Sequence, residues 1–599
     1  MCGIAGYIKS GSKIVEKELI SLIKNLEYRG YDSAGIATLK DKINIVKKEG
    51  SVTNLESFLQ NSEKDLLGIA HTRWATHGTP SEENAHPFKS NSGEWAIVHN
   101  GIIENYSILK TEVLKWKNIS FSSDTDSEVV AHLLDKYNQK NKIKTLINVC
   151  SKIVGSFAFV CINKSDKNSL FLAKRKSPLY VAIEKNEVFV ASDPICFNGK
   201  VKEYFSLEDD EFCKASSLGL IFFNENGECI SKCSNKLENI FYKSDKDQYS
   251  HFMLKEILEE PQVIDGIIKT YSEIKPLKIF TTKFLDKFNK IILVGCGTAY
   301  HSGLVGVNYL KSFASVEASC EIASEFRYSN PLINEKTLVV LISQSGETAD
   351  TLAVNELAKQ KHATTIALTN VLYSTLAKNA DFVLPVCAGP EIAVASTKAY
   401  IAQCSVLYIL AKHFAFLKFG DIPNYLEDLN ALKIKLKEMN FNKLENLPIL
   451  LAQNEKVFYL GRDIDNVIVL EGSLKLKEIT YINCQSYPLG ELKHGYLALI
   501  DNETFAVVLA TKKELLEKTL NGVSEAISRG ARVILITPFQ LNEEQSKNLF
   551  KVIHIEDLNC ALTPLLGAVY MQMLAYKTSV LKGINPDKPR NLAKSVTVE

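Results

Sequence analysis

Two stretches in the second half of the chain share one pattern of strand, glycine and glutamate. The apolar run Lys290–Gly295 ends in a glycine, and Glu325 follows that glycine by thirty residues. The apolar run Lys456–Gly461 ends in the same way, and Glu491 again follows by thirty residues. Either pair alone could arise by chance, but both together indicate a duplicated domain. Because strands alternate with helical segments here, each copy is predicted to be an α/β domain with a parallel sheet.

The first 240 or so residues have a different pattern, with short apolar runs bounded by glycine, serine or asparagine that are typical of strands. Four such runs are Ile4–Ile8, Leu67–Ala70, Trp95–Val98 and Ser156–Val160. Apolar side chains at helical spacing predict one helix from about Lys13 to Leu26. The polar run Lys243–Gln248 is predicted to be a linker, and a helix from His251 to Glu260 is expected to end at Pro261.

Size and charge restrict the class of protein. The chain has 599 residues, more than one hydrophobic core usually holds, so several domains are expected. Its hydrophobic content of 46% and charged content of 23% are ordinary for a globular protein. A net charge of +1 gives no electrostatic reason to expect nucleic acid or a membrane as a partner.

The thirteen cysteines are scattered, and the closest pair, Cys229 and Cys233, has no histidine nearby, so no zinc spacing is present. Scattered thiols suit a reducing cytosol. The N-terminus lacks the pattern of a signal peptide, and no apolar stretch approaches the roughly 18 residues of a membrane span. We therefore expect a cytoplasmic protein without metal or organic cofactor.

Cys2 directly follows the initiator Met1. Once Met1 is removed, Cys2 carries a free α-amine, which titrates near pH ~8 and can act as a base at neutral pH. Nucleophile and base then lie on one residue. A cysteine at position 2 is weak evidence by itself, because small residues are common there.

Four further motifs lie within about 130 residues of Cys2, and they are Tyr28–Ser33, His71–Gly78, Val98–Gly101 and Thr125–Glu128. Each has a structural explanation when it is taken alone. Asn100-Gly101 is a common hairpin turn, Asp126 could cap a helix, and Arg73 could be a surface charge. Taken together they also fit a chemistry, because an amide-cleaving thiolate needs donors for an oxyanion and a free amino acid needs a cation and an anion to hold it.

The five motifs resemble the N-terminal-nucleophile glutaminase domain of amidotransferases, which implies an αββα fold. The resemblance implies Cys2 as the nucleophile, its own amine as the base, and Asn100 with Gly101 as the oxyanion hole.

The same resemblance implies a set of glutamine-binding residues. Arg73 holds the glutamine carboxylate and Asp126 holds its ammonium group. Trp74 gates the passage of ammonia, and His77 belongs to the same binding motif.

A hydroxyl-rich turn follows the apolar strand within Val339–Thr351. Hydroxyls and backbone N–H groups at a helix N-terminus can hold a phosphate, although Ser and Thr are also ordinary helix caps. Two similar turns, Gly295–Thr298 and Val394–Thr397, favour a phosphate pocket. The candidate sugar-phosphate-binding residues are Thr298, Ser343, Gln344, Ser345, Thr348, Val394 and Ser396.

These turns resemble the sugar isomerase (SIS) domain, present twice as doubly wound α/β domains. The whole chain resembles the family of isomerising glutamine:fructose-6-phosphate aminotransferases, and the match extends through Glu471–Glu478, Gly490–Gly495 and Asn591–Glu599. It implies that ammonia from glutamine reaches fructose 6-phosphate and that the product is glucosamine 6-phosphate, a precursor of UDP-GlcNAc. The expected parts are a glutaminase domain (1–240), a linker and connecting helix (241–280), two SIS domains (281–430 and 445–590) and a catalytic tail (591–599).

The chemistry of the second half needs a lysine for a Schiff base, a base that moves a proton between C1 and C2, and a group that opens the sugar ring. The resemblance assigns these roles to Lys594, Glu478 and His494, with His494 supplied by the neighbouring subunit of a homodimer. Lys475 lies near Glu478 on the same helix and joins the sugar-phosphate-binding set. Residue patterns alone would not assign these roles, because one face of a Lys/Glu-rich helix is usually solvated and the end of a chain, where Lys594 lies, usually frays.

Two residues depart from the family pattern. Ala299 stands where a serine is usual and Tyr496 where a proline is common. Neither position carries a group that forms or breaks bonds, so we expect an effect on substrate affinity rather than on catalytic activity. Two other functions remain open. One is a different glutamine amidotransferase, which would need another acceptor half. The other is a sugar-phosphate sensor without catalysis, which would lack the lysine and the acid–base pair.

Overall fold

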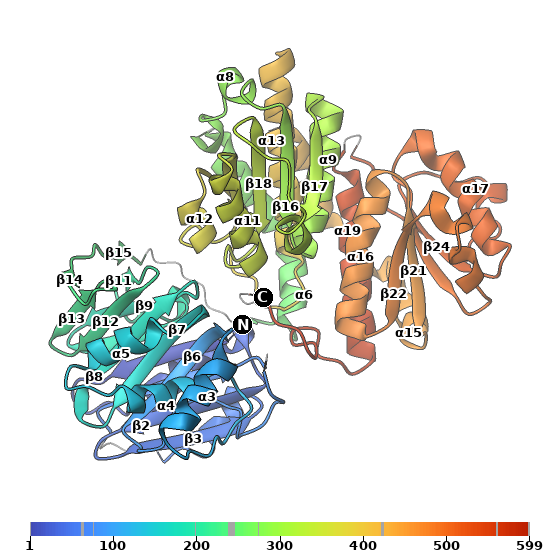
Figure 1. Ribbon diagram of the computed structural model, residues 1–599. Coiled ribbons are helices and arrows are strands. Elements are labelled where there is room, and N and C mark those ends of the chain that lie inside the picture. Colours follow the sequence, from blue (N-terminus) through green and yellow to red (C-terminus); the bar gives the residue numbers. More distant parts are fainter. Residues whose placement is uncertain are drawn as a thin grey trace. The chain divides into compact units, whose positions relative to one another are not determined.

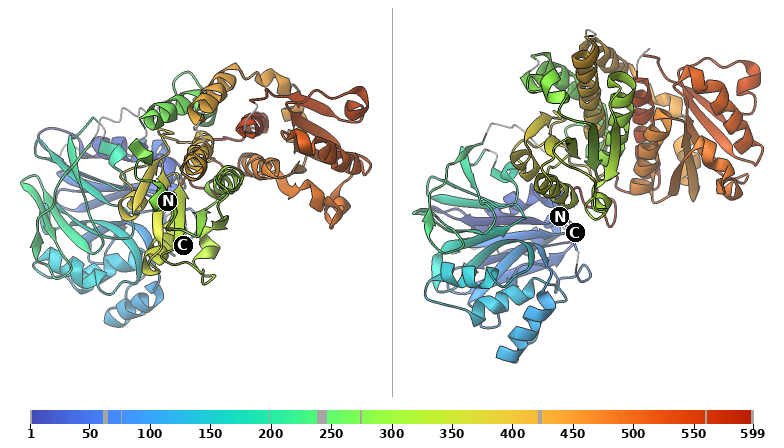
Figure 2. Two further views of the ribbon diagram at one scale, coloured as in Figure 1. Left: turned by 90° about the horizontal axis from the view of Figure 1, so that it is seen from above. Right: turned by 45° about the horizontal axis from the view of Figure 1, so that its top comes forward.

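The computed structural model describes residues 2–60, 65–75, 77–197, 199–237, 246–273, 275–420, 424–558 and 561–596. The chain divides into two compact units, Met1–Ser244 with Ala593–Glu599, and Asp245–Leu592. Each unit is described by itself below (Figures 1 and 2). Of the predicted linker Lys243–Gln248, residues 243–245 lie outside the described residues.

The first unit contains two sheets. The eight-stranded sheet has the order β15-β11-β9-β10-β1-β4-β2-β3. Its strands are β1 (Gly3–Ile8), β2 (Ser33–Leu39), β3 (Ile43–Glu49), β4 (Leu67–Arg73), β9 (Tyr180–Glu184), β10 (Glu187–Ala191), β11 (Glu203–Ser206) and β15 (Asn235–Lys236). The seven-stranded sheet has the order β14-β13-β12-β8-β7-β6-β5. Its strands are β5 (Phe88–Lys89), β6 (Trp95–Ile103), β7 (Gly155–Asn163), β8 (Asp166–Arg175), β12 (Glu211–Ser216), β13 (Gly219–Phe223) and β14 (Cys229–Ile230).

Helices cover the outer faces of both sheets (Figure 1). The helices are α1 (Val15–Lys24), α2 (Val52–Glu56), α3 (Tyr106–Trp116), α4 (Glu128–Lys136) and α5 (Lys142–Cys150). Strand β1 shows why the layers form, because its alternate side chains point to opposite faces. Ile4 and Ile8 belong to the core between the two sheets, whereas Ala5 and Tyr7 belong to the core beneath α1. The unit therefore has the predicted αββα layers, and the helix predicted near Lys13–Leu26 is α1.

The second unit contains two parallel five-stranded sheets with the same strand order, β17-β16-β18-β19-β20 and β22-β21-β23-β24-β25. The first is built from β16 (Lys290–Gly295), β17 (Ala318–Ile322), β18 (Thr337–Ser343), β19 (Thr364–Thr369) and β20 (Phe382–Pro385). The second is built from β21 (Lys456–Gly461), β22 (Asn483–Pro488), β23 (Phe505–Leu509), β24 (Arg532–Thr537) and β25 (Lys551–His554). The identical order confirms the predicted duplication.

The glycine that ends the first strand of each copy has one physical cause. A Cβ on Gly295 would lie 2.9 Å from the backbone of Ala299, and a Cβ on Gly461 would lie 2.6 Å from the backbone N of Asn466. The first turn of the next helix therefore packs directly on the strand end, where only glycine fits.

The helices of the second unit pack around and between its sheets. The longer ones are α6 (Phe252–Leu258), α7 (Glu260–Ser272), α9 (Thr298–Ala314), α11 (Ala349–Gln360), α13 (Lys398–Phe419), α14 (Tyr425–Glu438), α16 (Ile464–Thr480), α17 (Leu516–Ile527) and α19 (Thr563–Leu581). The short ones are α8 (Thr282–Leu285), α10 (Ala323–Phe326), α12 (Thr375–Asn379), α15 (Leu447–Ala452) and α18 (Glu543–Ser546). Helix α9 contacts both α13 and α16, and α16 contacts α19.

Two predictions about this unit were wrong. Pro261 does not end the helical region, because it lies in the first turn of α7, where a proline is tolerated. One helix of the described chain, Lys398–Phe419, is long and apolar enough to span a membrane, contrary to expectation. However, 83% of its apolar window is buried inside the protein, as in the core helix of a globular domain.

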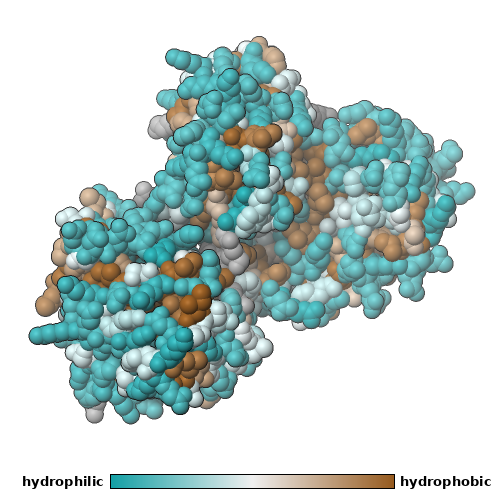
Figure 3. Space-filling view, in the orientation of Figure 1, coloured by the Kyte–Doolittle hydropathy of each residue, from teal (hydrophilic) through white to brown (hydrophobic). Residues whose placement is uncertain are grey.

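The visible surface of each unit is mainly hydrophilic, with hydrophobic residues in separate groups (Figure 3). Single exposed apolar side chains such as Leu218 and Leu332 are common on folded proteins.

Candidate active sites

Cys2 lies just before β1, against the chain segment that follows β4. The Cys2 Sγ is 3.3 Å from the backbone N of Trp74 and 3.5 Å from its carbonyl oxygen. Burial raises the pKa of the Cys2 thiol and outweighs the hydrogen bond from Trp74, which acts in the opposite direction. Since the thiolate is the nucleophile, a thiol with a raised pKa requires a nearby base.

Asn100 and Gly101 lie on β6 beside Cys2. The Asn100 Nδ2 donates a hydrogen bond to the Cys2 carbonyl oxygen at 3.0 Å. Gly101 has φ of 133°, and a Cβ there would lie 2.1 Å from the carbonyl oxygen of Ser156. The position therefore accepts only glycine, and because Asn100 and Gly101 both pair with β7 inside strand β6, they do not form a hairpin turn.

His71 orients the Asn100 side chain. Its Nε2 lies 3.1 Å from Asn100 Oδ1 and 3.0 Å from the His99 carbonyl oxygen. Both atoms are acceptors, so the Nε2 carries the proton and the Asn100 NH₂ group is left to face Cys2. Burial lowers the pKa of His71 to about 3, which keeps the ring neutral. The sequence analysis gave His71 no role, although its spacing of two from Arg73 on one strand predicts a shared face.

Arg73 lies at the end of β4 and is nearly fully buried. Its guanidinium donates hydrogen bonds to the carbonyl oxygens of His77, Gly78 (3.1 Å) and Thr79 (3.3 Å). Burial lowers the pKa of Arg73, against the opposing charges of Cys2, Asp32 and Asp126. The structure thus ties Arg73 to the loop that contains His77 and brings it within electrostatic reach of Asp126.

Asp126 precedes α4 and receives a hydrogen bond at Oδ2 from the backbone N of Ile103, at 2.7 Å. Since Ile103 ends β6, this contact joins the predicted ammonium-binding residue to the strand that carries Asn100. The His77 ring lies 6.1 Å from the Tyr106 ring, at the start of α3. Of these motifs, the ones that contain Trp74 and Asn100 contact Cys2 directly, and Asp126 is joined to the strand of Asn100.

The motif Tyr28–Ser33 supports the segment beside Cys2. A Cβ on Gly30 would lie 2.7 Å from the backbone N of Trp74, so the glycine permits a close approach of two chain segments. The Asp32 Oδ2 accepts a hydrogen bond from the backbone N of Ala75 at 2.8 Å. These contacts fix the course of the chain through Trp74.

The second site is built around α16. Glu471, Lys475 and Glu478 lie on one face of this helix, as their spacing predicts. The Lys475 Nζ is 3.2 Å from Glu471 Oε1 and 2.8 Å from Glu478 Oε2. The side chains of Glu471 and Lys475 are each 1% exposed, so this face is not a solvated one. Burial would lower the pKa of Lys475, but the charges of Glu471 and Glu478 outweigh it and raise that pKa.

The hydroxyl-rich turn lies where β18 leads into α11. The Ser343 Oγ is 3.0 Å from Thr348 Oγ1 and accepts a hydrogen bond from the backbone N of Gly346 at 3.0 Å. A Cβ on Gly346 would lie 2.0 Å from Ser374 Oγ, so the turn requires glycine. Ser345 accepts a hydrogen bond from the backbone N of Glu347 at 3.1 Å. Gln344, also in this turn, is half-buried.

Thr298 begins α9 at the carboxyl end of the neighbouring strand β16. In a parallel sheet this edge is the usual place for a ligand. The Thr298 hydroxyl donates to Glu471 Oε1 at 3.0 Å and accepts from Lys475 Nζ at 3.1 Å, so it bridges the two SIS copies. Ser396 donates to Glu391 Oε2 at 2.7 Å, and the backbone N of Val394 donates to the Asp587 carbonyl oxygen at 3.2 Å.

Two further predicted residues, His494 and Lys594, lie on other parts of the chain than α16. His494 is exposed just after a short 3₁₀ helix, Leu489–Lys493. The ring of Tyr496 stacks on Tyr487 with centroids 3.7 Å apart, which anchors the loop that carries His494. Lys594 belongs to the segment Ala593–Glu599, which groups with the first unit.

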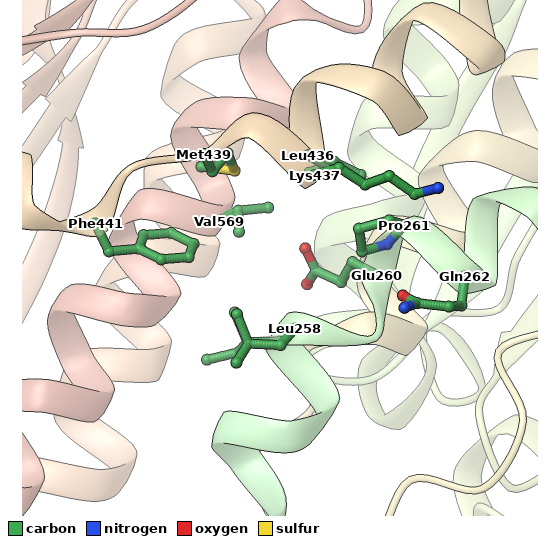
Figure 4. Close-up of a pocket in the computed structure, with 10 residues that line it drawn as sticks. Leu258, Glu260, Pro261, Gln262, Leu436, Lys437, Met439, Phe441 and Val569 are labelled. Atoms are coloured by element: carbon green, nitrogen blue, oxygen red, sulfur yellow. The ribbon is translucent and has the colours of Figure 1, made fainter. Parts of the chain in front are cut away.

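A separate cavity of about 200 Å³ lies between α6, α7, α14 and α19 (Figure 4). Figure 4 shows the Glu260 carboxyl group turned toward it, among apolar side chains such as Met439, Phe441 and Val569. Burial raises the pKa of Glu260 well above its usual range. The residues that line this cavity include none of the predicted site residues.

Within the described ranges, no group of three His, Cys, Asp or Glu side chains is arranged to hold a metal ion.

Comparison with known families identifies both kinds of domain. The glutamine amidotransferase domain model matches residues 71–199. The SIS domain model matches twice, at residues 284–413 and 450–582. The chain is therefore a glutamine amidotransferase domain followed by two SIS domains.

Similarity to individual proteins is more specific. The chain is 42% identical over 612 residues to the glutamine–fructose-6-phosphate aminotransferase (isomerizing) of Clostridium acetobutylicum, and the match covers 100% of both chains. It is 43% identical to the protein of that name from Caldanaerobacter subterraneus subsp. tengcongensis, again over 100% of both. Among solved structures, the C-terminal domain of glucosamine-fructose-6-phosphate aminotransferase from Francisella tularensis matches with a TM-score of 0.53 and 33% identity, covering 58% of this chain and 100% of that one. The chain belongs to the isomerising glutamine–fructose-6-phosphate aminotransferase family.

Proposed function

We propose that this protein hydrolyses glutamine and transfers the ammonia to fructose 6-phosphate, with isomerisation of the product to glucosamine 6-phosphate. The observation that carries the proposal is full-length similarity to aminotransferases of that name. The two sites described above fit the two half-reactions. The product would serve the synthesis of amino sugars such as UDP-GlcNAc.

In the glutaminase half, Cys2 attacks the side-chain amide of glutamine after removal of Met1. Its α-amine takes the thiol proton and later gives it to the leaving ammonia, which removes the obstacle of the raised thiol pKa. Asn100 Nδ2 and the backbone N–H of Gly101 stabilise the tetrahedral oxyanion. The contact of Asn100 with the Cys2 carbonyl oxygen supports this assignment.

Four residues hold glutamine and direct the ammonia. Arg73 binds the carboxylate and Asp126 the ammonium group, since planar guanidinium and carboxylate groups suit these partners. His77 completes the binding loop. Trp74, which follows Arg73 and contacts Cys2 through its backbone, gates the passage of ammonia.

In the sugar half, the phosphate lies at the carboxyl ends of β16 and β18. It is held by Thr298, Ser343, Gln344, Ser345 and Thr348, with Val394, Ser396 and Lys475 completing the sugar-phosphate site. Hydroxyl and backbone N–H groups at this strand edge support the assignment.

Three side chains carry the bond changes of the sugar. His494 opens the ring, Lys594 forms a Schiff base with the open-chain ketose, and Glu478 moves the proton between C1 and C2. Because His494 is exposed on its loop, we propose that it acts in the site of the neighbouring subunit of a homodimer.

The remaining proposals concern organisation. The domains extend over 1–240, 281–430 and 445–590, joined by a linker and connecting helix at 241–280 and followed by a catalytic tail at 591–599. The enzyme is cytoplasmic, uses small-molecule substrates alone, and has no nucleic-acid or membrane partner and no cofactor.

One experiment tests the whole proposal. Glutamate release from glutamine is measured with the Met1-processed protein, with and without fructose 6-phosphate, while glucosamine 6-phosphate is assayed. We expect equal amounts of glutamate and amino sugar, with hydrolysis stimulated by the sugar, and no glutamine use in Cys2→Ala. Hydrolysis indifferent to the sugar, without amino sugar, would leave a glutaminase and remove the proposed acceptor. Retained turnover in Cys2→Ala would refute the nucleophile.

A further inference from the structure

His301 lies on α9 of the first SIS copy and contacts Glu471 on α16 of the second. Its Nδ1 is 2.7 Å from Glu471 Oε2. Thr298, one turn earlier on α9, donates to Glu471 Oε1 at 3.0 Å. Two residues of one helix therefore hold both oxygens of a single carboxylate on the other.

Glu471 in turn helps to fix Lys475. An ammonium group has three N–H donors, and three oxygens surround the Lys475 Nζ. They belong to Glu478 at 2.8 Å, Thr298 at 3.1 Å and Glu471 at 3.2 Å. The lysine donates a hydrogen bond to Thr298 and forms ion pairs with Glu471 and Glu478, and its closest partner is the proposed proton carrier Glu478.

The electrostatics require a donor at position 301. Burial raises the pKa of Glu471, but the charge of Lys475 and the hydrogen bonds from His301 and Thr298 outweigh it and the net shift is downward, so Glu471 is ionised. A buried ion pair is stable only when its remaining oxygens are also satisfied. Because Glu471 Oε2 is an acceptor, the His301 Nδ1 must carry the proton that it shares with this oxygen.

We infer that His301 is a positioning residue for the isomerisation. It fixes Glu471, and through Glu471 and Lys475 it holds the Glu478 carboxylate in the orientation needed to move a proton between C1 and C2. The inference rests on the proposed function of Glu478. His301 transfers no proton itself, so its imidazole can be replaced by another donor at the same place.

Two variants of His301 distinguish a positioning role from proton transfer and from substrate binding. In His301→Asn the amide Nδ2 takes about the place of the imidazole Nδ1, so the donor to Glu471 is kept. In His301→Leu a side chain of similar bulk has no donor. The assays are kcat and KM for fructose 6-phosphate in amino-sugar formation, exchange of the sugar C1 hydrogen with solvent deuterium, and glutamate release from glutamine alone.

We expect His301→Leu to lower kcat and the rate of hydrogen exchange about 10- to 100-fold, as for loss of a hydrogen bond to a charged group that orients a catalytic base. The KM for fructose 6-phosphate should stay within about threefold, since the phosphate turn is untouched. His301→Asn should recover kcat to within about fivefold of the unmodified enzyme. Both variants should release glutamate from glutamine alone at the normal rate, because His301 lies outside the unit that contains Cys2.

Several results would overturn the inference. Normal kcat in His301→Leu would show that the contact does not position the base. Equal losses in the Asn and Leu variants would indicate that the imidazole itself titrates, and a change confined to KM would indicate substrate binding. If His301→Leu fails to fold, His301→Gln serves instead, because it displaces the donor by one methylene and should also lower kcat. Absence of amino sugar with the unmodified enzyme would refute the proposed function rather than this role.

Discussion

Replacing Asn100 with alanine tests the oxyanion hole at a position where the structure gives both a stability cost and a rate cost. The side chain makes two hydrogen bonds, one to the Cys2 carbonyl oxygen at 3.0 Å and one from His71 Nε2 at 3.1 Å. At about 1 kcal/mol each, their loss lowers the free energy of unfolding by about 2 kcal/mol. This corresponds to a fall in Tm of about 4–8 °C for a unit of this size.

The cost to the reaction is larger and separate. Loss of one oxyanion donor lowers kcat about 10²- to 10³-fold, or about 2.7–4 kcal/mol of transition-state stabilisation. The KM for glutamine should change little, because Arg73 and Asp126 remain in place. Glutamate release at saturating glutamine gives kcat, and a thermal melt gives the stability change.

A matched control is Asn105→Ala. Asn105 also makes two side-chain hydrogen bonds, to the Lys152 carbonyl oxygen at 2.9 Å and from the backbone N of Val154 at 3.0 Å. Its loss should lower Tm by a similar amount and leave kcat unchanged. A kcat within threefold of normal in Asn100→Ala, or an equal fall in both variants, would show that Asn100 is not an oxyanion donor.

Three further predictions concern other parts of the chain. Arg73→Lys should raise the KM for glutamine about tenfold or more with a smaller change in kcat, because an ammonium group cannot reproduce the planar guanidinium contacts; an unchanged KM in glutaminase kinetics would count against Arg73 as the carboxylate site. Although burial acts to raise it, hydrogen bonds from His132 and two serines lower the pKa of Glu128 to about 2. Since this pKa lies below that of the unfolded chain, ionised Glu128 stabilises the fold above about pH 4.5, and about 3 kcal/mol of the free energy of unfolding is lost as the pH falls toward 2. The free energy of unfolding of Glu128→Gln, measured against pH, should lack this loss. The same pH dependence in the variant and the unmodified protein would contradict the prediction. Tyr496→Ala should remove a stacking contact with Tyr487 worth about 0.5–1.5 kcal/mol and lower amino-sugar formation several-fold without affecting glutamate release; equal effects on both activities would mean a general loss of folding.

Local sequence patterns predicted the parts of the fold that depend on neighbouring residues. The repeated strand and glycine at Gly295 and Gly461 predicted the duplication, because each glycine serves a contact between a strand end and the next few residues. The 471, 475, 478 spacing predicted a shared helix face for the same reason. Pro261 misled the prediction because a proline that ends one helix and a proline in the first turn of the next look alike in sequence.

Local sequence patterns could not predict contacts between segments that are far apart along the chain. The role of His71 depends on Asn100, which lies on another strand, and the role of His301 depends on Glu471, 170 residues further along the chain. A Lys/Glu-rich helix is usually solvated on one face, which was the alternative to a site here, yet α9 packs against α16 and Lys475 is buried. The surroundings of a charged side chain are set by whichever element packs against it.

The sequence by itself determined the α/β class of the second half, the duplication and the candidate nucleophile, since these follow from residue type, order and spacing along the chain, and the resemblance of its motifs to a known family implied the αββα class of the first domain. Only the tertiary structure decided which side chains meet. Packing brings Cys2 to Asn100 across two sheets and joins the two SIS copies through Glu471, because hydrogen bonds and ion pairs depend on distance in space and not on separation in sequence.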